Sequence, residues 1–466
     1  MKEIFAEADR VIVWLGLADE YTTSAFQTLK YFAADDGTAD GRRTVAKLAA
    51  SRNERRVALE RLIQRPWFSR MWVIQEVAVS HGATVHCGPH AIDWDDLNTG
   101  LQRATGSGFV PFSDQVNKVT SIGHWRETFH RRRDSRARAE DLDMRLIMTD
   151  EGTKKATDLR DKIYSLRGLA SDEFAAGIVV DYRRSVEEVF TDCTRHLLRI
   201  RQDLRILSRV RQRGKKSSLR LPSWVPDWDL GDPGGVLNRY YRFCPTKMFC
   251  ASGRELSRAI VPTDGDIIRL FGIHVDKIQR IYSIRSLLQD RNTGELSINE
   301  ARLRHLANNL RLPETYDATG EESWMSLFDT LTADRTPLSS RISDDYRTKN
   351  FGHIDVMVPD KGKGAGLALK VSDAAWAKVS SMLDLIVDGK VLYITRNGYL
   401  GFTEELCREG DDVYVFCGGE VPFVVRATGD GFFAFHGETY VHGLMDGEVM
   451  GWLGGDDQQI EELSLK

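Results

Sequence analysis

VIVWLG, residues 11–16, is a continuous apolar run that ends in glycine, which is the pattern of a strand buried on both faces of a sheet. The next strand pattern is ATVHC at 83–87, and helical patterns cover 23–33 and 42–63 between the two strands. The order strand, helices, strand is typical of an α/β unit. Two strands are few for a buried sheet, so either its first strands are absent from this chain or later strands complete it.

One helical pattern in this region carries an acid on its apolar face. The segment RPWFSRMWVIQEVAVS, residues 65–80, predicts an amphipathic helix in which Trp72 and Glu76 share one face. A carboxylate at such a position is paired with a cation, has a raised pKa or faces a cleft. Glu76 is therefore the first candidate functional residue, and a structural ion pair with Arg65, Arg70 or another Arg is the alternative.

Composition places the chain among ordinary globular proteins. Its 466 residues are 42% hydrophobic and 28% charged, with a formal net charge of −4, which allows two or three domains and gives no general attraction to nucleic acid. The basic run at 130–141 contains acids and no aromatic residues, so a solvated helix face is expected there. Six scattered cysteines, no signal peptide and no apolar run of about 20 residues indicate a cytoplasmic protein without a membrane span.

The later regions differ in character from the first. We predict an α/β portion over 1–92, a mostly helical region over 93–230, a mixed α/β region with loops over 231–384 and a small antiparallel β unit over 385–466. The last prediction rests on short β-branched or aromatic runs separated by turn sequences such as Asn397-Gly398. The segment SWVPDWD at 223–229 is expected to pack its two Trp rings at a domain junction.

Sequence signals for other chemistry are weak. Cys87 and His90 have the spacing of metal ligands, but no second pair follows at zinc-finger distance, so no metal site is predicted. His436 and His442 fall in hairpin patterns and are expected to be structural or surface histidines. The glycine-rich run at 360–370 lacks the ending of a phosphate loop and is expected to be a surface loop.

Several blocks of the sequence resemble fungal heterokaryon incompatibility (HET) domain proteins and occur in the same order. They are AEADRVIVWLG, RPWFSRMWVIQEVAVS, ATDLRDKIYSLRGLAS, VDYRRSVEEVF, LPSWVPDWD, GYLGFTEELCREGDDVYVFCGGEVPFVVR and YVHGLMDGEVM. Members of this family usually open with an LSYxWG-like strand and a WIDxxCINQ-like block, and neither occurs here. The N-terminal part of the HET domain is therefore expected to be missing.

The resemblance implies a role in fungal non-self recognition, innate immunity and programmed cell death. It implies self-association, or association with other incompatibility proteins, and no nucleic-acid partner. The fold it implies is an incomplete TIR-like, flavodoxin-like α/β domain followed by a helical middle and the small antiparallel β unit.

TIR-like domains supply the second function that the resemblance implies. In several lineages they cleave NAD with a Glu that follows a Trp on a helix, and Trp72 and Glu76 have a similar spacing. On that analogy Glu76 stabilises the oxocarbenium-like charge of the transition state, while Trp72, Trp14 and Gly16 bind the substrate. NAD is then a substrate, and no other cofactor is predicted. An assembly protein and an NAD glycohydrolase, impaired by the missing segment, both stay open.

Overall fold

The computed structural model describes most of the chain in two compact units. Described are residues 2–35, 51–111, 113–133, 154–210, 218–230, 249–253, 257–289, 296, 298–334, 389–453 and 459–466. The first unit comprises residues 1–196 and 228–232, and the second comprises 197–227 and 233–466. The glycine-rich run at 360–370 and most of the basic run at 130–141 lie outside the described residues.

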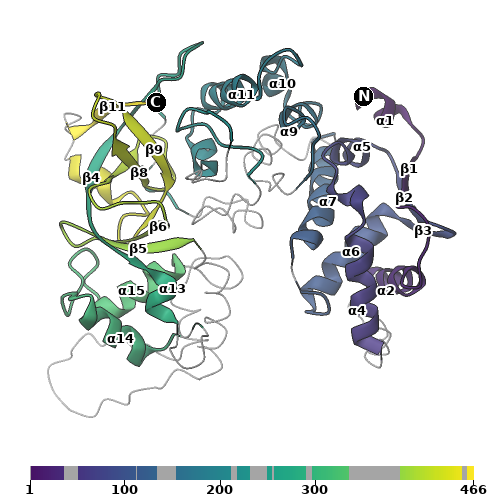
Figure 1. Ribbon diagram of the computed structural model, residues 1–466, viewed down its shortest axis with the longest axis horizontal. Helices are drawn as coiled ribbons and strands as arrows, with labels where there is room; N and C mark the ends of the chain where they lie inside the picture. The colour runs from purple at the N-terminus through teal and green to yellow at the C-terminus, as the bar shows by residue number, and fades with distance from the viewer. Residues whose placement is uncertain are drawn as a thin grey trace. The chain divides into compact units, whose positions relative to one another are not determined.

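A small sheet forms one part of the first unit. Its three strands, in spatial order, are β1 (Val11–Trp14), β2 (Ala83–Cys87) and β3 (His90–Asp93). Strand β1 pairs with β2 in parallel, as the strand, helices, strand pattern predicts, and β2 and β3 form an antiparallel hairpin. Helices α2 (Thr22–Ala34) and α4 (Arg52–Ile63) lie between β1 and β2 in the sequence, and α6 (Trp94–Gly106) follows β3 (Figure 1).

Strand β1 is buried on one face only. Val11 and Val13 are buried, whereas Ile12 and Trp14 are 60% and 53% exposed. The prediction that the VIVWLG run is buried on both faces is therefore wrong. Within the part of the chain that the structure describes, packing covers one side of this strand, and alternate side chains point to opposite faces of a strand.

The predicted helix over 65–80 is also corrected, because it is two separate segments. These are a 3₁₀ turn, η2 (Pro66–Ser69), and a short helix, α5 (Val73–Ala78). Between them Arg70 has an extended backbone and pairs with Lys155, and the Met71 N–H donates to the Lys155 carbonyl oxygen at 3.0 Å. This distant pairing takes the backbone groups that a continuous helix would use.

Helix α7 (Asp114–Arg133) fixes the end of α5 through a buried arginine. The Arg126 guanidinium donates to the carbonyl oxygens of Val77 at 3.0 Å, Ser80 at 2.5 Å and His81 at 3.1 Å. It also pairs with Asp95 at 3.1 Å. These bonds attach the last turn of α5 and the residues that follow it to α7.

The remaining helices of the range 93–230 are short, apart from the last. They are α9 (Asp161–Tyr164), α10 (Asp172–Gly177) and α11 (Val186–Arg201), followed by the 3₁₀ turn η4 (Arg205–Arg209). Helix α1 (Lys2–Glu7) lies before β1.

The segment SWVPDWD contributes one buried Trp ring to each unit. Trp224 is buried within the second unit, where its indole N–H donates to the Asp266 carbonyl oxygen at 2.8 Å. Trp228 is buried within the first unit against Phe190. The two Trp rings of SWVPDWD therefore pack in different units.

A closed barrel of five strands forms the core of the second unit (Figure 1). Around the ring its strands are β4 (Ile268–Ser283), β7 (Asp412–Phe416), β8 (Phe423–Ala427), β9 (Phe433–Glu438) and β11 (Glu461–Leu465). Three more strands extend the sheet from β4, namely β5 (Lys390–Thr395), β6 (Leu400–Glu404) and β10 (Tyr440–Val441). The prediction of strands at the C-terminal end is confirmed, but the sheet is closed and is not wholly antiparallel, because β9 and β11 run parallel.

Strand β4 makes the closure possible because it is long enough to pair with three partners. Its first part pairs with β11, its middle with β7 and its last part with β5. Register shifts between His274 and Asp276 and between Ile278 and Arg280 mark bulges that bend it. One buried apolar cluster joins side chains of the barrel strands to those of the added strands β5 and β10; its members include Ile273, Val275, Tyr393, Val413, Val424 and Val441.

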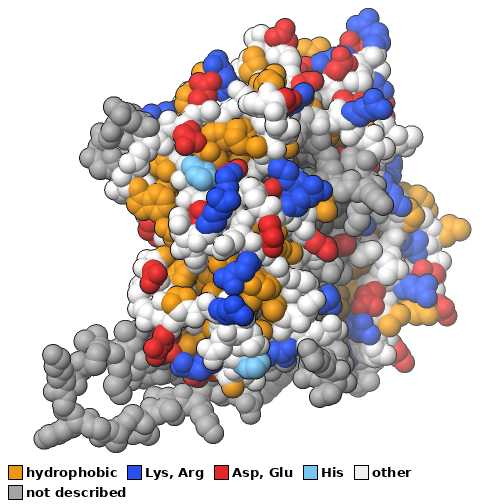
Figure 2. All heavy atoms as spheres, turned by 60° about the vertical axis from the view of Figure 1, so that its left-hand side comes forward, with side chains coloured by type: hydrophobic (Ala, Val, Ile, Leu, Met, Phe, Trp, Pro, Cys, Tyr) orange, Lys and Arg blue, Asp and Glu red, His pale blue; other side chains and the backbone are white. Residues whose placement is uncertain are grey.

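Helices α13 (Ile284–Leu288), α14 (Glu300–Asn309) and α15 (Ser323–Thr332) complete the second unit, with the 3₁₀ turn η5 (Glu448–Leu453) near its end. Helices α14 and α15 pack on each other, and α15 also packs on β6. None of the described helices is long and apolar enough to cross a membrane. In the described part of the face drawn in Figure 2, acidic and basic side chains are interspersed with apolar ones.

Candidate functional site

Glu76 occupies the middle of α5 and is partly buried. Among the described residues, no side chain or backbone group makes a hydrogen bond or ion pair with its carboxylate. Burial raises the pKa of Glu76, and the positive charge of Arg70 opposes that rise. The carboxylate is therefore poorly solvated, and among the described residues it forms no ion pair.

The alternative pairing with Arg65 is excluded by the bonds that Arg65 makes elsewhere. One of its nitrogens, Nη1, donates to the carbonyl oxygens of Leu15 at 3.0 Å and Leu17 at 2.9 Å. Its other terminal nitrogen forms an ion pair with Asp19 at 3.0 Å. Arg65 thus holds the turn at the end of β1, and Arg70 acts on Glu76 only through its charge.

Trp72 lies one helical turn before Glu76, and its indole is bonded to a distant motif. Its Nε1–H donates to Asp161 Oδ2 at 3.0 Å, and the hydroxyl of Tyr182 donates to the other oxygen of Asp161 at 2.7 Å. Asp161 belongs to ATDLRDKIYSLRGLAS and Tyr182 to VDYRRSVEEVF. Three blocks of the sequence, at 65–80, 156–171 and 180–190, therefore meet at one carboxylate.

Arg160 extends this meeting point into a larger polar cluster. It makes two bonds to Asp158, at 2.9 and 2.7 Å, and its guanidinium lies over the Tyr182 ring with 5.3 Å to the centroid. It also donates to the carbonyl oxygens of Tyr182 and Arg184. Burial and the hydrogen bond to Asp161 raise the pKa of Tyr182. We call Trp72, Asp158, Arg160, Asp161 and Tyr182 the Asp161 cluster.

Trp14 and Gly16 lie at the carboxyl end of β1. The side chain of Trp14 is exposed, and Gly16 has a φ of +101° with its carbonyl oxygen bonded to the Gly88 N–H at 2.9 Å. No described hydrogen bond, ion pair or ring contact links either residue to Trp72 or Glu76. None of the four lines the polar cavity of about 430 Å³ between α6 and α7, which Asp95, Asn98, Arg126 and His130 help to form.

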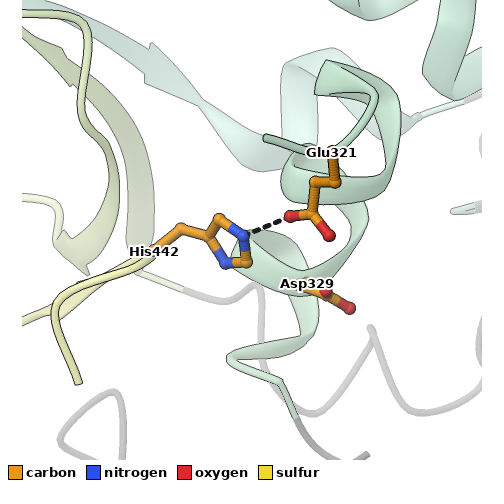
Figure 3. Close-up of side chains that lie close together, drawn as sticks. All are labelled: Glu321, Asp329 and His442. Carbon is orange, nitrogen blue, oxygen red and sulfur yellow. Dashed lines mark hydrogen bonds and ion pairs between the residues drawn. The ribbon is translucent and has the colours of Figure 1, made fainter. Parts of the chain in front are cut away.

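A second group of candidate functional side chains lies in the second unit and is drawn in Figure 3. Glu321 lies just before α15, Asp329 lies within α15, and His442 directly follows β10. The three side chains offer ligand atoms that all lie within 4.8 Å of one another. His442 Nε2 and Glu321 Oε1 are 2.5 Å apart, and the other ring nitrogen of His442 is 3.0 Å from the Tyr440 hydroxyl.

This group is largely shielded from solvent. Asp329 and His442 are 2% and 7% exposed, and Glu321 is partly buried. Burial works against ionisation of Glu321, but hydrogen bonds from His442 and Ser326 outweigh it and lower the pKa of the carboxyl. A buried imidazole beside two carboxylates is a ligand set that proteins use for metal ions.

Sequence reasoning did not find this group. The sequence predicts a structural or surface histidine at 442, and both ring nitrogens of His442 do have partners. Glu321 and Asp329 carried no motif, because their partner His442 lies more than 100 residues further along the chain. No local spacing could have joined them.

Comparisons with known proteins identify the family. The family model described as heterokaryon incompatibility protein (HET) matches residues 1–76, and the one described as Het-6 beta-barrel domain matches residues 343–453. Heterokaryon incompatibility protein 6, OR allele, of Neurospora crassa is 26% identical over 537 residues, covering 96% of this chain and 78% of the relative. These matches support a fungal HET domain protein. No solved structure matches it.

The candidate residues of this HET domain protein fall partly in the HET match, partly in the barrel match and partly outside both matches. Trp14, Gly16, Trp72 and Glu76 all fall in the HET match, and Glu76 is its last residue. Asp161 lies outside both matches. His442 lies in the barrel match, whereas β4 and β11, which help to close the barrel, fall outside it.

Proposed function

We propose that this HET domain protein acts in heterokaryon incompatibility, as a component of fungal non-self recognition that ends in regulated cell death. The observation that carries the proposal is the match along 96% of the chain to a heterokaryon incompatibility protein. The output of the protein is assembly, either with itself or with other incompatibility proteins.

The assembly proposal is supported by the apolar face that β1 presents. Ile12 and Trp14 point outward from this strand, and Leu17, which follows it, is 79% exposed. Apolar side chains grouped on an exposed strand are typical of surfaces that pair with another protein. In this proposal β1 belongs to a TIR-like, flavodoxin-like sheet, supported by its parallel pairing with β2 and the helices between them.

The second candidate function is cleavage of NAD by Glu76. It is favoured because the Glu76 carboxylate is partly buried and has no described ion-pair partner. A carboxylate in this state can stabilise positive charge that develops on a substrate. The carboxylate would stabilise the oxocarbenium-like ribose as the bond to nicotinamide breaks. The indole N–H of Trp72 is engaged by Asp161, so Trp72 would offer the substrate its ring face rather than a hydrogen bond.

Three variants separate these functions in one experiment. The chain is expressed from an inducible promoter in a filamentous fungus, in strains of several incompatibility types, and viable hyphal compartments and cellular NAD are measured. Ile12→Lys places a charge on the β1 face, and Glu76→Gln removes the candidate catalytic charge. Leu406→Lys is the matched control, since Leu406 is an exposed apolar residue of the second unit.

The two functions predict different outcomes. If assembly through β1 is the output, the purified wild-type chain sediments as a large species, and Ile12→Lys abolishes both that species and cell death, while Glu76→Gln and Leu406→Lys act as wild type. If NAD cleavage is the output, Glu76→Gln abolishes NAD loss and cell death together. A wild-type chain that kills in no strain type would overturn the incompatibility proposal itself.

A further inference from the structure

The side chains of Glu321, Asp329 and His442 gather three metal-ligand groups beside the barrel (Figure 3). Their ligand atoms lie within 4.8 Å of one another, so small side-chain movements bring all three to a common ion. We propose that this cluster binds one divalent transition-metal ion of the Zn²⁺ class. The proposal does not depend on the role of Glu76 or on assembly through β1.

The ligand set selects the class of ion. Mg²⁺ and Ca²⁺ prefer sites made wholly of oxygen atoms, whereas the imidazole of His442 suits Zn²⁺ and its neighbours in the first transition series. One His and two carboxylates give three protein ligands. A three-ligand zinc site keeps a fourth position for water, and the partly exposed Glu321 side chain gives the ion a way in.

The surrounding groups already orient two of the three ligands. The Tyr440 hydroxyl lies 3.0 Å from His442 Nδ1, which leaves Nε2 directed at the carboxylates. Ser326 donates to Glu321 Oε1 at 2.8 Å. Hydrogen bonds of this kind fix the tautomer and direction of ligands in metal sites. The third ligand, Asp329, is held on the well-packed helix α15.

Binding requires one local rearrangement. His442 Nε2 and Glu321 Oε1 are 2.5 Å apart and share a hydrogen bond, whereas two ligands of one zinc ion, each at about 2.1 Å, lie roughly 3.3 Å apart. A rotation of the Glu321 side chain opens that distance, because the carboxylate is partly exposed and precedes the helix. The bound ion would then tie α15 to the residue that follows β10.

Zinc titration of the full-length, tag-free protein tests the site. After dialysis against a chelator, calorimetry with Zn²⁺ is expected to show one site per chain that Mg²⁺ does not occupy. Asp329→Asn and Glu321→Gln keep the size of each side chain, and each is expected to weaken Zn²⁺ binding by more than the roughly 10- to 100-fold that loss of an outer partner costs. Glu322→Gln is the control, because this neighbouring carboxylate bonds to Arg304 and Trp324 instead.

Co²⁺ binding to the wild-type protein tests the same site without any variant, so the proposal can be tested even if a variant fails to fold. Co²⁺ is expected to give the visible bands of a four-coordinate site with nitrogen and oxygen ligands. A thiolate charge-transfer band would place the ion on cysteine and overturn the proposal. Absence of stoichiometric binding, or equal loss in Glu322→Gln, would show that the contact between His442 and Glu321 is only structural.

Discussion

The indole Nε1 of Trp72 donates a hydrogen bond to Asp161, which lies 89 residues further along the chain. The bond joins the segment that matches the HET family to a stretch that neither family model covers. Since Tyr182 donates to the other oxygen of the same carboxylate, Asp161 connects α5, α9 and the segment before α11. The HET segment is therefore stabilised by residues that follow it.

A double-mutant cycle on Trp72→Phe and Tyr182→Phe measures this connection. Each variant removes one donor, and each is expected to lower the free energy of unfolding by roughly 1–2 kcal/mol, because hydrogen bonds to charged groups are worth about 1.5–3 kcal/mol. The double variant is expected to lose more than the sum, since it leaves Asp161 without either donor. Urea unfolding followed by circular dichroism gives the values. Tyr31→Phe, on an exposed tyrosine, is expected to change nothing.

Replacing Glu76 by Gln is expected to stabilise the fold near neutral pH. The folded-state pKa of Glu76 is raised by burial, so its contribution to stability is complete below the unfolded pKa and declines as the pH rises through the folded pKa. Glu76→Gln removes that decline. The gain in free energy of unfolding at about pH 7 is on the order of 1 kcal/mol, and it vanishes at about pH 4.

Unfolding curves of the wild type and Glu76→Gln across this pH range check the prediction. Glu60→Gln is a suitable control, because Glu60 pairs with Arg56 on the surface of α4 and is expected to give a small effect without that pH trend. A loss of about 3 kcal/mol at neutral pH would instead indicate that Glu76 has a buried cationic partner.

Local sequence patterns predicted the elements of the fold better than their packing. The strand at 11–14 and its parallel partner at 83–87 follow from apolar runs and the helices between them. The exposure of Ile12 and Trp14 does not follow, because every residue of VIVW is apolar and the run carries no alternation. The local sequence does not predict the break in the 65–80 helix either, because the break depends on the pairing of Arg70 with the distant Lys155.

Long-range pairing also explains what was missed in the barrel and its site. Turn sequences such as Asn397-Gly398 predict hairpins from neighbouring residues alone, and Gly398 indeed has a φ of +90°. Closure depends on β4, more than 100 residues before its hydrogen-bonded partners β5 and β7. The approach of Glu321 to His442 depends on the same tertiary contacts. The hydrogen bond between Trp72 and Asp161 likewise has no signature in local spacing.

Asp412 in the barrel is expected to make stability fall in acid. It accepts bonds from His274 at 2.8 Å and Lys277 at 2.7 Å. Burial works against its ionisation, but these two bonds prevail and hold its pKa below the usual range. A lowered pKa gives stability that is present above the unfolded value and lost as the pH falls through the folded value. Asp412→Asn is thus expected to cost roughly 2 kcal/mol at neutral pH.

The cost of Asp412→Asn is expected to decline as the pH falls through the lowered pKa of Asp412 and to disappear at the acidic pH where the wild-type carboxyl is also protonated. Thermal unfolding at several pH values, compared with the exposed-site variant Glu409→Gln, gives the difference. A cost that stayed constant down to this pH would show that packing of the side chain, rather than its charge, stabilises the junction of β4 and β7.

Gly16→Ala is expected to destabilise the first unit at the turn that ends β1. Gly16 has a φ of +101°, which residues with a side chain rarely adopt, and a Cβ there would lie 3.4 Å from Arg65 Nη1. The backbone strain is expected to cost about 1–2 kcal/mol and to loosen the bonds from Arg65 to the carbonyls of Leu15 and Leu17. Gly106→Ala at the end of α6 is the matched control, because a Cβ there meets nothing within 4 Å. Hydrogen exchange of the β1 and β2 amides should rise in Gly16→Ala alone, and unchanged exchange would show that the turn tolerates a side chain.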